Sequence, residues 1–219
     1  MNNKITFLIL SGSTKEYIDP VRYITNESSG QMGSAIAEAA TKKGYEVVFV
    51  SGTARVMPKN VKVVNVITAL DMFKATKSSF KEADIIIGAA AIVDYRPLVV
   101  SKHKIKKDCS NIIMSLKLKQ NPDIIKYCGQ NKKNQVVAGF ALETEDLIPN
   151  ALIKLKKKNL DLIVANGIET FNSKNATVSI VTSDMVLEIR NKKKNIIAEK
   201  IINETVRIFK SISPCKNDH

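Results

Sequence analysis

The stretch ADIIIGAAA, residues 83–91, decides the fold class because a continuous apolar run ends there in small residues. Its three consecutive isoleucines lack polar alternation, which is typical of a strand covered on both faces. Five similar runs recur along the chain: ITFLIL (5–10), EVVFVS (46–51), VKVVNV (61–66), QVVAGFAL (135–142) and LDLIVAN (160–166). We therefore expect a mostly parallel central sheet.

Helical patterns separate most of these runs, at 33–43, 68–82, 122–130 and 145–158. Alternating strands and helices imply right-handed crossovers and helices on both faces of the sheet. After residue 166, ATVSIVTSD and MVLEIRN predict an antiparallel hairpin, and a closing helix follows at about 195–212. We predict an α/β, doubly wound, Rossmann-like domain over residues 1–212, with a C-terminal β-hairpin plus helix and a frayed tail at 213–219.

One segment breaks the alternation. Residues 92–125 read IVDYRPLVVSKHKIKKDCSNIIMSLKLKQNPDII, which predicts an irregular lid excursion after the fourth strand and a short strand around 112–118. Long insertions at the carboxyl end of a central strand tend to cover the ligand crevice of such sheets. The lysines of this excursion are therefore candidates for ligand binding.

Composition narrows the class of partner. The 219 residues carry a net charge of +13, which favours an anionic partner. Because the lysines are scattered and aromatic residues make up only 5%, we expect anionic small molecules and no nucleic acid. No apolar run approaches the ~20 residues that span a bilayer, so we expect no membrane association and a cytoplasmic location. Three cysteines without CxxC spacing predict neither a disulfide framework nor a metal site.

A dinucleotide-dependent oxidoreductase is the first alternative for this architecture. Its fingerprint needs GxGxxG after the first strand and an acidic residue after the second. The first turn here reads SGSTKEY, and the second strand ends in Ser51. Neither half of the fingerprint is present, and the sequence also lacks a Walker GxxxxGK[ST] motif, a GxSxG elbow and HExxH.

A long polar segment, DPVRYITNESSGQMG (19–33), precedes the first predicted helix. Its Ser28, Ser29 and Gly30 lie just before the helix, where backbone N–H groups and the helix dipole favour an anion. Asn26 is uncharged and would orient a carbonyl or stabilise an oxyanion. A hydroxyl cap and a simple turn are the structural alternatives for these residues.

Six motifs in this order resemble one family: IDPVRYITNESSGQMGSAIAEAA, GAAAIVDYRP, KIKK, NPDI, GFALET and KKNLDLIVAN. Each is weak alone. Together they closely resemble phosphopantothenoylcysteine synthetase (phosphopantothenate–cysteine ligase), the synthetase half of the bacterial bifunctional coenzyme A biosynthesis protein. The resemblance covers about residues 5–212.

The resemblance implies a two-step ligase. CTP activates the carboxylate of 4′-phosphopantothenate as an acyl-cytidylate, and the amine of L-cysteine then displaces CMP. It also implies Mg²⁺ bound with the triphosphate, a homodimer, and no flavin, since the decarboxylase half is absent from this sequence. Two alternatives stay open: a monofunctional ligase that works with a separate phosphopantothenoylcysteine decarboxylase, or an excised domain. Eukaryotic relatives use ATP, so an ATP-dependent version stays open, as does a non-catalytic nucleotide-binding regulatory module.

The resemblance also assigns roles to residues. It makes Asn26 and Lys104 catalytic, Lys104 in forming the acyl-nucleotide and Asn26 in turning it over. Phosphate or substrate binding falls to Gly12, Ser28, Ser29, Gly30 and Gly33. Nucleotide binding falls to Ala89, Ala90, Ala91, Asp94, Lys104, Asn121, Pro122, Asp123, Ile124, Phe140, Lys154 and Lys158.

Two residue-level departures from the family pattern stand out. The first turn reads SGST, where relatives usually carry a further glycine or a proline. Gln120 stands where a lysine commonly precedes NPD, which removes one positive charge near the expected nucleotide.

Overall fold

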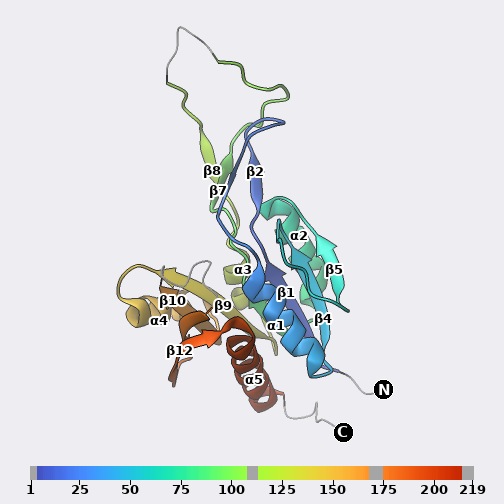
Figure 1. Ribbon diagram of the computed structural model, residues 1–219, viewed down its shortest axis with the longest axis vertical. Coiled ribbons are helices and arrows are strands. Elements are labelled where there is room, and N and C mark those ends of the chain that lie inside the picture. Colours follow the sequence, from blue (N-terminus) through green and yellow to red (C-terminus); the bar gives the residue numbers. More distant parts are fainter. Residues whose placement is uncertain (1–3, 108–112, 168–174, 214–219) are drawn as a thin grey trace.

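The computed structural model describes residues 4–107, 113–167 and 175–213, and within them an eight-stranded sheet forms the centre of the molecule (Figure 1). Its strand order is β12-β11-β10-β9-β6-β1-β4-β5, with all neighbours parallel except at β11 and β12. The strands are β1 (Thr6–Ser11), β4 (Glu46–Ser51), β5 (Lys62–Asn65), β6 (Ile85–Gly88), β9 (Val136–Glu143), β10 (Leu162–Gly167), β11 (Asn175–Val181) and β12 (Val186–Lys193). The predicted mostly parallel sheet with a C-terminal hairpin is confirmed.

Helices cover both faces of the sheet, as a doubly wound fold requires. They are α1 (Gln31–Lys42), α2 (Ala69–Phe80), α3 (Ile124–Asn131), α4 (Leu147–Lys158) and α5 (Lys194–Ile212). In β1, Phe7 and Ile9 pack into the core under α1 and α5, while Leu8 and Leu10 pack into the core under α2, α3 and α4. All four side chains are fully buried, and the burial of each stabilises the fold by about 1.5–3 kcal/mol.

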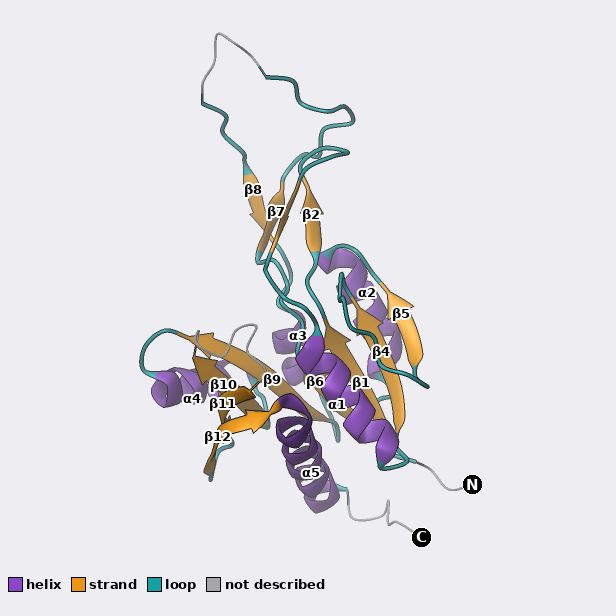
Figure 2. Ribbon diagram, viewed as in Figure 1, coloured by secondary structure: helices purple, strands orange, loops and turns teal. Residues whose placement is uncertain are grey.

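Two antiparallel ribbons project from the sheet where the sequence predicted a loop and an irregular lid (Figure 2). One pairs β2 (Lys15–Tyr17) with β3 (Tyr23–Thr25), and the other pairs β7 (Tyr95–Pro97) with β8 (Leu118–Gln120). The strand expected around 112–118 is therefore displaced toward the C-terminus; residues 108–112 lie outside the described part. We call the two ribbons and the described residues between their strands, within 15–25 and 95–120, the arm.

Asp19 ties the two halves of the arm together. Its buried carboxylate accepts hydrogen bonds from the backbone N–H groups of Val21, Arg22 and Ile105, at 2.8–3.1 Å. The guanidinium of Arg22 also donates to it and to the carbonyl of Ile105. The excursion therefore runs outward beside the β2–β3 ribbon, and the expectation that it covers the crevice is not met by this chain alone.

The sheet order creates one switch point. From β1 the chain moves outward through β4 to β5, and then returns to β6 on the other side of β1. In open α/β sheets, ligands bind outside the carboxyl ends of the strands at such a point. The residues that follow β1 and β6 are thus placed for function. No helix in the described ranges is long and apolar enough to cross a membrane.

Candidate active site

The start of α1 faces the switch point with exposed helix-terminal donors. Gly30 is its N-cap, with φ of 74°, a left-handed conformation that glycine adopts readily. No side chain caps this helix, so N–H groups of its first turn are available to a ligand. Ser28 accepts a hydrogen bond from the Gly30 N–H at 3.4 Å, which shapes the turn. This arrangement favours an anion.

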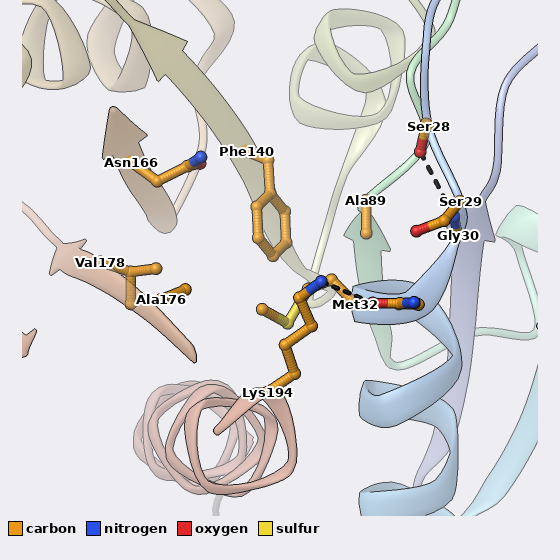
Figure 3. Close-up of a pocket in the computed structure, with 11 residues that line it drawn as sticks. Ser28, Ser29, Gly30, Met32, Ala89, Phe140, Asn166, Ala176, Val178 and Lys194 are labelled. Carbon is orange, nitrogen blue, oxygen red and sulfur yellow. Dashed lines mark hydrogen bonds between the residues drawn. The ribbon is translucent and has the colours of Figure 1, made fainter. Parts of the chain in front are cut away.

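A cavity of about 130 Å³, here called the α1 cavity, lies between the start of α1, the sheet and α5 (Figure 3). The predicted residues that line it are Ser28, Ser29, Gly30, Ala89 and Phe140. Figure 3 shows the Phe140 ring pointing into the space between the start of α1 and the end of β10. Five of the predicted residues therefore lie around one cavity, and their binding roles stay predictions.

A second cavity of about 200 Å³, the α3 cavity, lies at the start of α3. Phe140 lines both cavities, which makes it the boundary between them. The other predicted residues around the α3 cavity are Ala90, Asp94, Asn121, Pro122, Asp123, Ile124 and Lys158, and Gln120 lines it as well. Most of the predicted nucleotide-binding set thus converges on one place.

Two polar side chains of the NPDI motif are already engaged within the protein. Asn121 is buried; its amide donates to the Val93 carbonyl and its oxygen accepts from Arg96, both at 2.7 Å. Asp123 accepts from the N–H of Lys126 as the cap of α3 and pairs with Lys158 at 2.9 Å. These bonds fix the cavity wall, and the predicted nucleotide contacts remain predictions.

Asn26 lines a larger hollow that adjoins the α1 cavity, and it is hydrogen-bonded to a residue of the α3 cavity. Its side-chain amide donates to the carbonyl of Ile92 at 3.0 Å, and Ile92 lines the α3 cavity. The adjoining hollow, of about 550 Å³, is lined by Asn26 and Ser28 together with the cationic side chains of Lys15 and Arg55. Asn26 is thereby held close to the turn that precedes α1.

Besides Asn26, five residues of the predicted set line neither the α1 cavity nor the α3 cavity. Gly12, with φ of 77°, packs against Ala54, and a Cβ on Gly33 would lie 2.2 Å from the Ser11 hydroxyl. The N–H of Ala91 bonds to the Gly12 carbonyl at 2.9 Å, which joins two loops. Lys154 pairs with Glu143. Lys104 is exposed on the arm, next to the Ile105 that Asp19 binds.

Sequence reasoning missed three polar residues that line the α1 cavity, Gln31, Asn166 and Lys194, as well as the apolar Met32, Ala176 and Val178. Asn166 was detectable, because it stands near the carboxyl end of a predicted parallel strand, as Ala89 does. Lys194 lies in the run Lys192–Lys194, which has the pattern of a solvated face. Burial lowers the pKa of the Lys194 ammonium below its ordinary value.

Among the residues described, no group of three or more His, Cys, Asp or Glu side chains is placed to hold a metal ion. Cys128 is free and buried in α3, and burial raises the pKa of its thiol to about 12. At neutral pH this thiol stays protonated and unreactive. Cys109 and Cys215 lie outside the described residues.

Comparison with known proteins decides the family. Residues 2–208 match the family described as DNA/pantothenate metabolism flavoprotein C-terminal domain. The chain belongs to this family. The coenzyme A biosynthesis bifunctional protein CoaBC of Borreliella burgdorferi is 41% identical over 204 residues, which cover 92% of the chain and 52% of that relative. The family predicted from the six motifs is thus confirmed.

Solved structures agree with this flavoprotein C-terminal domain assignment. The crystal structure of the C-terminal domain of CoaBC is 35% identical, with a TM-score of 0.82, and the match covers 96% of the chain and all of that structure. A mutant of Cab2 in complex with phosphopantothenate-cysteine, only 20% identical, shares the fold, with a TM-score of 0.82 over 97% of the chain and 88% of that structure. The chain spans about half the length of the curated relatives it matches.

Proposed function

We propose that this protein is a phosphopantothenate–cysteine ligase of coenzyme A biosynthesis. The carboxylate of 4′-phosphopantothenate attacks the α-phosphorus of CTP, so that an acyl-cytidylate forms and pyrophosphate leaves. The amine of L-cysteine then attacks the acyl carbon, forming the amide and expelling CMP. The observation that carries the proposal is the meeting of two cavities at Phe140, at the switch point of a chain 41% identical to a CoaBC protein.

The two cavities suit two polyanionic substrates. We assign phosphate binding to Ser28, Ser29 and the uncapped start of α1, because helix-terminal N–H groups bind anions. Phe140 offers an aromatic face on which the nucleotide base would stack. The paired Lys158–Asp123 side chains and the buried Asn121 keep the opposite wall rigid. Binding of both substrates here would bring the carboxylate and the α-phosphorus together.

Mg²⁺ fits this site as an ion carried by the triphosphate. Mg²⁺ prefers oxygen ligands and is usually held by one or two carboxylates together with substrate phosphates. Asp94 is an exposed carboxylate on the α3 cavity and would be the protein ligand. Bound there, the ion would neutralise charge on the pyrophosphate that leaves.

A homodimer would complete the site. Lys104 is on the arm, outside both cavities, and the arm exposes large apolar side chains: Val99 is 78% exposed and Ile113 77%. Leu98 and Val100 beside Val99 are also more than half exposed, and a contiguous apolar patch of this kind marks an interaction surface. We propose that the arms of two copies pair and that each brings its Lys104 to the other copy's cavities.

The dimer and the division of labour share one test. Lys104→Gln prevents the acyl-cytidylate from forming, whereas Asn26→Asp lets it form and slows its conversion, as single-turnover assays would show. Mixing the two variants regenerates a complete site only if Lys104 acts across the interface; about a quarter of wild-type activity then returns, from one site in half of the dimers. No recovery in dimers that demonstrably exchange would contradict the shared site.

The function itself is tested by pyrophosphate release. Purified protein is given Mg²⁺, 4′-phosphopantothenate and either CTP or ATP, with and without L-cysteine. Cysteine-stimulated release with amide product supports the ligase, and the better nucleotide decides between CTP and ATP. No release by folded protein with either nucleotide would contradict the ligase and favour a regulatory module. We further propose a cytoplasmic location and a phosphopantothenoylcysteine decarboxylase as the enzyme that consumes the product.

A further inference from the structure

Lys194 reaches the α1 cavity from α5, the helix that packs beside α1. It is the first residue of α5, and its Nζ donates to Oε1 of Gln31, the first residue of α1, at 2.6 Å. Figure 3 shows the side chain extending from α5 toward the start of α1, below the ring of Phe140. The packing of α5 beside α1 therefore delivers an ammonium group to the place where α1 presents its N–H groups.

Lys194 differs from the predicted site lysines Lys154 and Lys158 because its side-chain partner is neutral. Lys158 pairs with Asp123, and Lys154 pairs with Glu143. The hydrogen-bond partner of Lys194 is an amide, and none of the described residues that line the α1 cavity is Asp or Glu. The positive end of the helix dipole adds to this charge. An ammonium held here without a carboxylate leaves the cavity with excess positive potential.

The cavity has the size and donors for a phosphate group. Its volume of about 130 Å³ is below the ~300–1,000 Å³ typical of sites that enclose a whole ligand, so it admits part of one. The hydroxyls of Ser28 and Ser29 stand on the wall opposite Lys194. Hydroxyls, helix-terminal N–H groups and an ammonium together can donate to several phosphate oxygens.

We infer that Lys194 is a substrate-binding residue that contacts a phosphate group in the α1 cavity. The inference rests on the proposed function, which supplies two sources of phosphate, CTP and 4′-phosphopantothenate. A purely structural alternative is that Lys194 only joins α5 to α1 through Gln31. The two readings differ in what removal of the charge does to stability and to ligand affinity.

Calorimetric titration tests the inference. Wild type, Lys194→Gln and the control Lys200→Gln, which removes an exposed lysine of the same helix, are each titrated with CTP, 4′-phosphopantothenate and inorganic pyrophosphate. Lys194→Gln should weaken binding of at least one of them by about tenfold to a hundredfold, the effect of a charge-assisted hydrogen bond. The Lys200→Gln protein should stay within about twofold of wild type. Weakening confined to CTP or to 4′-phosphopantothenate identifies the source of the phosphate.

Thermal unfolding without ligand separates binding from structure. A phosphate-binding Lys194 predicts an unfolding temperature for Lys194→Gln equal to or above that of wild type, because an uncompensated charge is removed. A lowered unfolding temperature with affinities within twofold of wild type would overturn the inference, as would wild-type protein that binds none of the three ligands. If the wild type catalyses ligation and Lys194→Gln binds all three normally, the proposed function stands and this inference fails. If the wild type does not ligate but binds pyrophosphate through Lys194, the inference stands and the function fails.

Discussion

Gly33→Ala is the sharpest test of why the first turn of α1 requires a glycine. Gly33 lies in the first turn of α1, and a Cβ placed there would lie 2.2 Å from the Ser11 Oγ and 2.5 Å from the Ser11 Cβ. Ser11 is fully buried at the end of β1, and its hydroxyl donates to the Gly30 carbonyl at 3.2 Å. The new methyl group must displace Ser11 or push α1 away from the sheet.

The expected cost follows from three contributions. Overpacking a close-packed position costs about 1–3 kcal/mol. Loss of the Ser11–Gly30 hydrogen bond costs about 1 kcal/mol more. The higher helix propensity of alanine relative to glycine stabilises α1 by about 1 kcal/mol and offsets part of this cost. The net destabilisation is therefore about 1–3 kcal/mol, which in a chain of this size lowers the unfolding temperature by roughly 2–12 °C.

A double-mutant cycle checks the cause. Ser11→Gly removes both atoms of the clash, and the nearest remaining atom is the Ser11 Cα at 3.4 Å. Urea unfolding of the two single variants and the double variant should give a coupling of about 1–3 kcal/mol in favour of the double. A Gly33→Ala protein as stable as wild type, or two additive effects, would show that packing against Ser11 is not what requires glycine here.

Three further predictions follow from the site and the arm. Phe140→Ala should raise the KM for the nucleotide about tenfold while Phe140→Tyr stays near wild type, as steady-state kinetics would show; equal KM values would exclude stacking on Phe140. Arg22 holds the pKa of Asp19 far below 3.8, so the stabilisation from this carboxylate is present above about pH 4 and is lost as pH falls through the folded-state pKa. Asp19→Asn should therefore speed proteolysis of the arm at pH 7. A proteolysis rate like that of wild type would contradict this. Burial lowers the pKa of Lys194 in the folded state below its unfolded value of 10.5, so the free energy of unfolding of the wild type rises as pH increases from the folded pKa to the unfolded pKa. Lys194→Gln should lack this rise in the urea midpoint. A pH profile equal to that of wild type would contradict the prediction.

The sheet was predictable because each central strand is a short apolar run with its own boundaries. Ile85–Gly88 and Val136–Glu143 are covered on both faces, so their hydrophobicity alone identifies them. The helices were predictable to within a few residues, because buried positions recur at helical spacing between those strands. The edge strand Lys62–Asn65 was also found, although Lys62 and Asn65 are exposed and only the two valines between them are partly buried.

The arm was not predictable from local pattern. Its strands are only three residues long, KEY and YIT in one ribbon and YRP and LKQ in the other. Runs this short carry no periodicity that distinguishes a strand from a loop. What orders them is a set of contacts between distant parts of the chain, above all the bond from Ile105 to Asp19, 86 residues apart.

The candidate site divides along the same line. Ser28 was found because it precedes a helix start that the sequence marks, whereas Ala89 and Phe140 were assigned through the family resemblance. They come together because the carboxyl ends of parallel strands meet at one edge of the sheet. Lys194 was missed because the sequence pattern does not distinguish it from the two lysines before it, Lys192 and Lys193. Only the packing of α5 beside α1 turns the third of them toward Gln31 and leaves the first two exposed. The sequence therefore locates the α1 cavity, but which lysine lines it depends on how the helices pack. For this reason a lysine-rich composition predicts an anionic ligand without identifying the lysine that we propose binds it.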